Sequence, residues 1–408
     1  MKRNVISLLL AAAVLSVLLA GCGEKQAKVE VTETPAPQES AAPVETPAAP
    51  EASAQPEETP DPEAEARRAR YDAAFRTHTP DETVLLVNDT PISWQDYYSW
   101  LYDIASQMEQ RYEVTDWNEP RDELAGIVPD STFGSYVRKT ALGYVVQVAV
   151  IQQKAQEMGV TMTDEQKAEL DATMQGYYER FGGQEAFEEL LAQSYLTTDY
   201  FRRQNESMAL INNIYAEMYG EKGEKLSEED AIAYVKDNGY LYAKHILFKT
   251  VDDDRQPLDE ATQAEKKAEA EEVLRQLREC TPEELPERFD ALMRQYSEDT
   301  GMLSYPDGYY FHAGEMVPAF EQTVRSLEEN GLSDLVESDY GYHIIFCPPM
   351  RSEHTMGYDA NYQPYGAKAL ASAALFDTIA QEWFEEAERK VVYVNDFDAL
   401  DLNELLNR

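Results

Sequence analysis

The stretch that decides the fold opens at residues 240–248 with Tyr-Leu-Tyr-Ala-Lys-His-Ile-Leu-Phe and closes at residues 340–346 with Tyr-Gly-Tyr-His-Ile-Ile-Phe. Each run surrounds one histidine, His245 or His343, with aliphatic, aromatic and β-branched residues. This composition is typical of a mostly buried strand. We therefore predict two neighbouring strands of one sheet, each of which carries a histidine.

The segment between the two histidines is predicted to hold three helices and one short strand. Apolar residues recur at helical spacing over residues 270–277 and again over 289–296, and residues 309–311 read as a strand. Pro318 suits the first position of a third helix, which we expect to close at Gly331. The predicted order is β-α-α-β-α-β, which makes residues 239–350 an α+β unit.

The chain on either side of this unit reads as a mainly α-helical lobe. Helical patterns cover residues 62–76, 133–158, 198–219 and 366–389, and Ser93 and Thr163 are predicted N-caps. Residues 83–88 and 391–394 read as lone strands, and a lone strand is not stable. We expect these strands to pair, with Leu85 and Val392 close enough for a cross-link, so that residues 351–408 pack on residues 62–238 around the inserted unit.

The N-terminus resembles a lipoprotein signal peptide over residues 1–21. Met1-Lys2-Arg3 is basic, residues 5–20 are apolar but short for a membrane span, and Leu19-Ala20-Gly21-Cys22 follows. The resemblance implies cleavage before Cys22, attachment of a lipid such as palmitate to Cys22, and a membrane anchor on the extracytoplasmic face. An ordinary signal peptide is the competing interpretation, and the cysteine directly after the small-residue pair argues against it.

Residues 22–61 are predicted to be a disordered tether. They are rich in Pro, Ala, Glu, Thr and Ser and contain almost no aromatic or large aliphatic side chain. Such a segment cannot bury enough apolar surface to offset the entropy lost on ordering.

The charge balance and the cysteines limit the classes of partner and cofactor. A formal net charge of −42 argues against a nucleic-acid partner, because phosphate contacts need Lys or Arg. Beyond Cys22, the chain has only Cys280 and Cys347, which could form a disulfide but are expected as two free buried thiols. His78, His312 and His354 have no ligand spacing, so we predict neither a metal site nor another cofactor.

Four short motifs occur in the order found in parvulins. These are Lys244-His245-Ile246-Leu247, Tyr296-Ser297-Glu298-Asp299, Gly314-Glu315-Met316-Val317-Pro318-Ala319-Phe320 and Tyr340-Gly341-Tyr342-His343-Ile344-Ile345. Residues 239–350 therefore resemble a parvulin peptidyl-prolyl cis-trans isomerase, or rotamase, with an FKBP-like fold. The arrangement of anchor, helical lobe, parvulin unit and helical tail is similar to the PrsA-like and SurA-like extracytoplasmic foldases.

The resemblance implies a role for seven side chains. It places His245, Asp299, Ser338 and His343 in a polar catalytic network, and Phe311, Met316 and Phe320 in a pocket for the substrate proline. The chain departs from the family at Pro306-Asp307-Gly308-Tyr309-Tyr310, where many members have Gly-Gly-x-Leu-Gly. Each assignment has a structural alternative, because strand histidines, a turn-forming Asp299 and apolar residues at helical spacing also occur in ordinary cores.

Rotation of an X-Pro amide faces a barrier of about 18–20 kcal/mol, because twisting destroys amide resonance. No bond has to break. An apolar cradle favours the twisted amide over the planar, more dipolar ground state, so catalysis is differential binding.

The predicted function is isomerisation and chaperoning of unfolded or partly folded exported polypeptides that contain X-Pro bonds. One alternative is a non-catalytic holding chaperone with a vestigial parvulin module, and another is a structural envelope lipoprotein. A homodimer is compatible with the sequence. The acidic loop at Asp252, Asp253 and Asp254 predicts discrimination against phosphoserine or glutamate before proline, unless the loop is free in solvent and screened.

Overall fold

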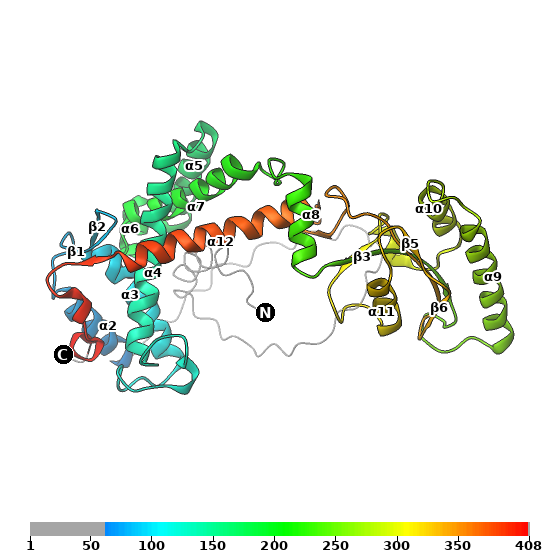
Figure 1. Cartoon of the computed structure of the whole chain (residues 1–408). Helices are drawn as coiled ribbons and strands as arrows, with labels where there is room; N and C mark the ends of the chain where they lie inside the picture. Colours follow the sequence, from blue (N-terminus) through cyan, green and yellow to red (C-terminus); the bar gives the residue numbers. More distant parts are fainter. Residues whose placement is uncertain (1–61, 407–408) are drawn as a thin grey trace, which may run out of the picture. The chain divides into compact units, whose positions relative to one another are not determined.

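The computed structural model describes residues 62–406, and many of its helices and strands are labelled in Figure 1. The described chain forms two compact units, one made of residues 62–210 and 381–406 and the other of residues 211–380. The predicted signal peptide, the lipidation site Cys22 and the tether over residues 22–61 lie outside the described residues.

The first unit is mainly helical, and its helices begin and end where local chemistry predicts. Ser93 accepts the backbone N–H of Asp96, and Thr163 forms a capping box with Gln166. Gly159 ends a helix in the left-handed conformation, with φ 67°. The helices are α2 (Pro62–Phe75), α3 (Trp94–Arg111), η1 (Asp122–Leu124), α4 (Phe133–Met158), α5 (Asp164–Phe181), α6 (Gln184–Ala192), α7 (Thr198–Tyr219), η3 (Phe397–Ala399) and α13 (Leu402–Leu406), and α7 continues into the second unit.

A three-stranded sheet in this unit joins segments from both ends of the described chain. β1 (Thr83–Val87) lies between β2 (Thr90–Ser93) and β10 (Val392–Tyr393). The predicted pairing of the two lone strands is therefore confirmed. The register places Leu85 opposite Tyr393 and Leu86 opposite Val392, one residue away from the pair that we expected.

The second unit is built on an antiparallel sheet with strand order β4-β3-β7-β5, in which β6 also pairs with β7. The predicted adjacency of the two histidine strands is confirmed, because β3 and β7 are hydrogen-bonded neighbours. The strands are β3 (Leu241–Lys249), β4 (Tyr309–Phe311), β5 (Gly331–Leu332), β6 (Val336–Ser338) and β7 (Gly341–Cys347).

Helices bury both faces of this sheet. Ile246, Phe248, Ile344 and Phe346 form one core with α9 (Glu260–Arg278) and α10 (Leu285–Tyr296). On the opposite face, Ala243 and Ile345 pack with Phe320 of α11 (Pro318–Ser326). Successive side chains of a strand alternate between faces, so His245 and His343 share the α11 face. The expected end of α11 at Gly331 is wrong: the helix ends at Ser326, and Gly331 begins β5.

The order of elements in the second unit agrees with the predicted β-α-α-β-α-β pattern, with β5 and β6 as additional short strands before β7. The unit also holds α8 (Glu228–Asp237), η2 (Thr300–Leu303), a hairpin of β8 (Gly357–Tyr358) and β9 (Pro364–Tyr365), and the first part of α12 (Ala367–Arg389). The described chain is a mixed α+β protein.

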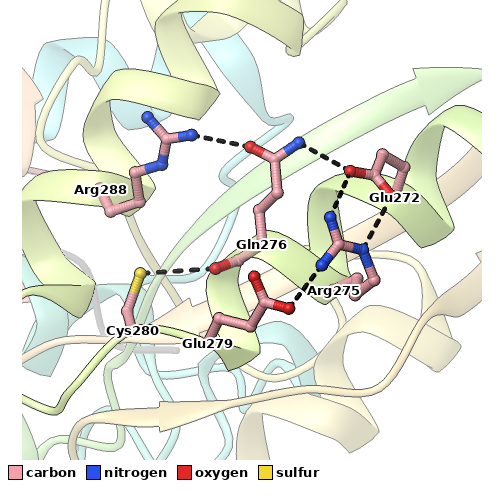
Figure 2. Close-up of polar contacts among 6 residues, drawn as sticks. All are labelled: Glu272, Arg275, Gln276, Glu279, Cys280 and Arg288. Atoms are coloured by element: carbon pink, nitrogen blue, oxygen red, sulfur yellow. Dashed lines mark hydrogen bonds and ion pairs between the residues drawn. The ribbon is translucent and has the colours of Figure 1, made fainter.

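Cys280 and Cys347 are both free thiols. Cys347 is buried as expected, whereas Cys280 is half-buried at the end of α9. Figure 2 shows the Cys280 thiol donating to the Gln276 carbonyl, with Sγ and O 3.5 Å apart. The Gln276 side chain accepts from Arg288 of α10 at 2.7 Å, which ties the two helices together at their surface.

Among residues 62–406, no helix is both long enough and apolar enough to cross a bilayer. The same residues contain no group of three His, Cys, Asp or Glu side chains arranged to hold a metal ion.

Candidate active site

Four elements bring the predicted polar residues together on the α11 face of the sheet. The β3–β7 register places His245 opposite Ile345 and His343 opposite Leu247, so the two histidines are diagonal neighbours. Asp299 caps η2 directly after α10, and Ser338 ends β6. Both histidines are nearly inaccessible, with 6% and 4% of their surface exposed.

A continuous row of hydrogen bonds runs through these four side chains. His245 Nε2 lies 2.7 Å from Asp299 Oδ2, and the two histidine Nδ1 atoms are 3.1 Å apart. His343 Nε2 lies 2.7 Å from Ser338 Oγ, which also accepts the backbone N–H of Tyr340 at 3.1 Å.

One set of proton positions satisfies every contact in the row with two neutral imidazoles. Because a carboxylate only accepts, His245 donates through Nε2 and its Nδ1 is left as an acceptor. His343 must then donate through Nδ1, and its Nε2 accepts the Ser338 hydroxyl proton. When both rings are neutral, the row has one direction, from Ser338 to Asp299.

Burial and hydrogen bonding together determine the charges of His343 and Asp299. Desolvation, reinforced by the neighbouring His245, lowers the pKa of His343 to about 3, which keeps that ring neutral. For Asp299, burial alone would raise the pKa, but hydrogen bonds from His245, Tyr309 and the Gly301 backbone outweigh it and lower the pKa to about 2. The row thus ends on an ionised carboxylate at neutral pH.

A cavity of about 350 Å³ opens above the row. The polar residues that line it include both histidines and Asp299, and the apolar part of its wall contains Met316 and Phe320. The Phe320 ring meets both imidazoles edge-on, with ring centroids 5.2 Å from His245 and 5.7 Å from His343. The other lining residues are Leu247, Tyr309, Glu315, Val317 and Tyr340.

Family models match both parts of the chain. Residues 245–347 match a PPIC-type PPIASE domain, and residues 71–215 match a SurA-like N-terminal domain. The SurA-like match falls mainly in the first compact unit, and the PPIC-type match lies in the second unit and contains the whole polar row. The chain is a parvulin-type foldase of the PrsA/SurA-like group.

Named relatives of this foldase include the PrsA foldase proteins of two bacteria. That of Oceanobacillus iheyensis is 27% identical over 241 residues, which cover 59% of this chain and 70% of the relative. That of Staphylococcus aureus is 28% identical over 180 residues, and this match spans 43% of the chain and half of the relative. The matches support an isomerase and chaperone and do not favour the non-catalytic alternative.

Among solved structures, PrsA from Bacillus subtilis is 19% identical to this foldase. The match covers 81% of this chain and 100% of that one, with a TM-score of 0.23. PrsA from Bacillus cereus is also 19% identical, with the same coverage and a TM-score of 0.25. At these TM-scores the two matches carry no structural argument.

One predicted pocket residue of the foldase lies elsewhere. Phe311 is 1% exposed and is not part of the cavity wall. It packs in the core behind Phe320, with ring centroids 5.9 Å apart. The β3–β4 register explains this position, because Phe311 lies opposite Leu241, whereas Tyr309 lies opposite Ala243, nearer to His245.

Tyr309 is a functional candidate that our sequence analysis did not identify. Its hydroxyl donates to Asp299 Oδ2 at 2.7 Å, and its ring lines the cavity. A Cβ on Gly301 would clash with this hydroxyl, so the glycine makes room for the contact. The signal in the sequence was the departure from the family run at residues 306–310, which includes Tyr309.

Proposed function

We propose that this foldase isomerises X-Pro bonds in unfolded or partly folded exported polypeptides, and that the cavity above the histidine row binds the proline. The observation that carries the proposal is the row itself, a continuous set of hydrogen bonds from Ser338 to Asp299 beneath an apolar wall.

The pocket can lower the barrier because it is both apolar and preorganised. Met316 and Phe320 offer the prolyl ring a surface without hydrogen-bonding groups, which favours an amide that has lost part of its dipole on twisting. The row beneath is fully paired, so it needs no rearrangement during rotation. The chain's own groups supply no nucleophile to this step, since no bond is made or broken.

We assign His245, Asp299, Ser338 and His343 to the network and Met316 and Phe320 to the proline pocket. Phe311 supports Phe320 from behind. Removing one network hydrogen bond is expected to lower turnover about 10- to 100-fold, because a factor of ten corresponds to about 1.4 kcal/mol.

The proposal extends to where the enzyme works. Cys22 would carry the lipid, and residues 22–61 would hold the folded part away from the bilayer, reaching roughly 3 Å per residue where proline-rich. A Cys22→Ser chain should be released from the membrane fraction. Retention of that variant in the membrane would contradict the anchor.

We also propose that residues 62–238 and 351–408 form the chaperone lobe around an isomerase domain at residues 239–350. This lobe would hold unfolded clients while their prolines reach the cavity. Cross-linking of the purified chain at low concentration would test the predicted homodimer.

The deciding experiment follows the refolding of an exported protein whose slow phase is X-Pro isomerisation. The wild-type chain should speed the slow phase and suppress aggregation. His245→Ala, if folded by circular dichroism, should still suppress aggregation but speed the slow phase 10- to 100-fold less. A wild-type chain that suppresses aggregation without changing the slow phase would be a holding chaperone instead.

A further inference from the structure

A row of tyrosines leads away from the cavity of the foldase. Tyr309 lines the cavity, and its ring centroid lies 5.5 Å from that of Tyr305. The Tyr305 ring meets Tyr358 of β8 edge-on, with centroids 5.8 Å apart. We call Tyr305, Tyr309, Tyr358 and Tyr362 the tyrosine row.

The row is attached to the β8–β9 hairpin, which follows the parvulin domain in the chain. The Tyr358 hydroxyl donates to the Ser304 carbonyl at 2.5 Å, which ties the hairpin to the loop that carries Tyr305. The Tyr358 ring nevertheless stays 39% exposed. The contact therefore positions an aromatic surface without burying it.

Tyr362 stands at the tip of this hairpin and is 84% exposed, the most exposed large hydrophobic side chain in the described part of the chain. Its turn is well ordered by hydrogen bonds, because Asp359 Oδ1 accepts the backbone N–H groups of Asn361 and Gln363 at 2.8 and 2.9 Å. Single exposed apolar residues are common on protein surfaces. Tyr362 differs because a fixed turn presents it on the hairpin whose Tyr358 leads towards the cavity.

We propose that the tyrosine row is a binding subsite for the part of a client polypeptide that flanks the proline, and that it prefers aromatic side chains there. The inference rests on the proposed function, because the same chain that places its proline in the cavity would continue along the row. Tyrosine rings suit this task, since they offer a large apolar surface with little side-chain entropy to lose and they tolerate many sequences.

The spacing sets the length of client that can use the subsite. Two ring-to-ring steps of 5.5 and 5.8 Å are spanned by about three to four extended residues, at roughly 3.3–3.6 Å each. A tetrapeptide centred on the proline therefore occupies only the cavity and does not reach Tyr358. Tyr362, farther along the hairpin, requires a longer peptide.

The test compares peptides that share an Ala-Leu-Pro-Ala core. Extended peptides carry tyrosines four and seven residues from the proline, on the N-terminal side in one peptide and on the C-terminal side in another, and each has a twin with serines at those places. Wild-type kcat/KM should be roughly two- to tenfold higher for a tyrosine peptide than for its serine twin on one side, the range expected of aromatic pairs.

Substitutions then separate the row from the pocket. Tyr358→Ser with Tyr362→Ser should remove the advantage of the tyrosine peptide, whereas Tyr362→Phe, which leaves the Tyr358 hydrogen bond in place, should keep it. Ala360→Ser on the same turn is the matched control. The core peptide should be turned over equally by all of them. An unchanged tyrosine advantage in the serine variant, or none in the wild type on either side, would overturn the subsite.

Failure of the proposed function would look different. A chain without activity on the core peptide would refute the isomerase, but fluorescence anisotropy could still compare its affinity for tyrosine and serine peptides. Equal affinities would then overturn the subsite as well, and a tyrosine preference lost in the serine variant would support it.

Discussion

Each side chain of the histidine row is hydrogen-bonded to the next side chain in the row. Truncating His245 would leave His343 Nδ1 without a partner, whereas Asp299 would keep the Tyr309 hydroxyl on Oδ2 and the Gly301 amide on Oδ1. Buried polar groups that lose a partner cost roughly 1–3 kcal/mol each. The middle of the row is therefore expected to be more sensitive to substitution than the Asp299 end.

Tyr309→Phe tests the contact at that end. The variant keeps the ring in the cavity wall and removes only the 2.7 Å hydrogen bond to Asp299. We expect the pKa of Asp299 to rise from about 2 and kcat/KM on a proline tetrapeptide to fall by about tenfold. Tyr305→Phe is the matched control. Equal activities of wild type and Tyr309→Phe would show that the hydroxyl has no role.

His343 makes stability depend on pH. Its pKa is about 3 in the folded chain against an ordinary value of 6.5, so below pH 6.5 the unfolded chain binds a proton that the folded chain does not. The contribution is fully present above pH 6.5 and is lost as the pH falls towards 3, by at most about 1.4 kcal/mol per pH unit. Asp299, with a pKa of about 2, adds to this loss only below its ordinary value of 3.8.

Comparison with His343→Gln isolates this effect, because glutamine does not titrate. Urea unfolding of the second unit at pH 7.5 and at pH 4.5 should show the stability gap between wild type and variant shrinking in acid by up to about 2.7 kcal/mol. A gap that stays constant over this range would mean that His343 titrates normally.

The sequence motifs contain most of the residues that line the cavity, but they do not show which residues of β4 belong to its wall. Both histidines, Asp299, Met316 and Phe320 line one cavity. Tyr309 and Phe311 share one strand face, so alternation alone could not tell them apart. What separates them is the register of β4 on β3 and the position of α11, and both are long-range features that no local pattern contains.

The length of each helix or strand determined whether its position could be predicted from the sequence. The long helices and the buried strands β3 and β7 show clear periodicity, and their caps were readable. The two- to four-residue strands β2, β5, β6 and β8 are too short to show a period and form only because a partner strand is present. This is why the end of α11 was misplaced.

The β1–β10 pairing makes a sharp prediction about register. Leu86→Cys with Val392→Cys should cross-link under mild oxidation, because these residues are directly opposite. Leu85→Cys with Val392→Cys should cross-link poorly, since a one-residue shift places side chains on opposite faces. Peptide mass mapping distinguishes these bonds from any formed by Cys280 or Cys347. Equal yields from the two pairs would contradict the register.

The acidic loop after β3 is a folded turn. Asp252 Oδ1 accepts the backbone N–H groups of Asp254 and Gln256 at 3.0 and 2.8 Å. The Arg255 guanidinium lies 5.6 Å from the centroid of Tyr340, which lines the cavity. The loop thus approaches the cavity wall through its one cation, while the Asp253 side chain is fully exposed.

Because the loop carries three carboxylates and one cation, we expect the foldase to discriminate against a negative charge before proline. At low salt, kcat/KM should rank Lys-Pro and Leu-Pro peptides above Glu-Pro, and high salt should narrow the gap. Asp253→Asn with Asp254→Asn should raise Glu-Pro turnover, and Arg255→Ala should lower it. Equal rates for the three peptides at low salt would refute steering by this loop.

At the scale of the whole molecule, the chain leaves one compact unit and returns to it. Residues 381–406 belong with residues 62–210, and β10 completes the sheet that β1 begins. The lone strands at both ends of the folded sequence indicated this arrangement, because neither could be stable alone. The second unit, formed by the intervening residues, holds both the histidine row and the tyrosine row.

The central claim is that the cavity above the histidine row catalyses X-Pro rotation. Nuclear magnetic resonance exchange on an Ala-Leu-Pro-Ala peptide measures this rotation directly and at equilibrium. Uncatalysed exchange takes tens to hundreds of seconds. The wild-type chain should bring it below about one second at micromolar concentration, and folded His245→Ala should be about 10- to 100-fold slower. An exchange rate that the wild-type chain leaves at its uncatalysed value, or a folded His245→Ala variant as fast as the wild type, would contradict the account.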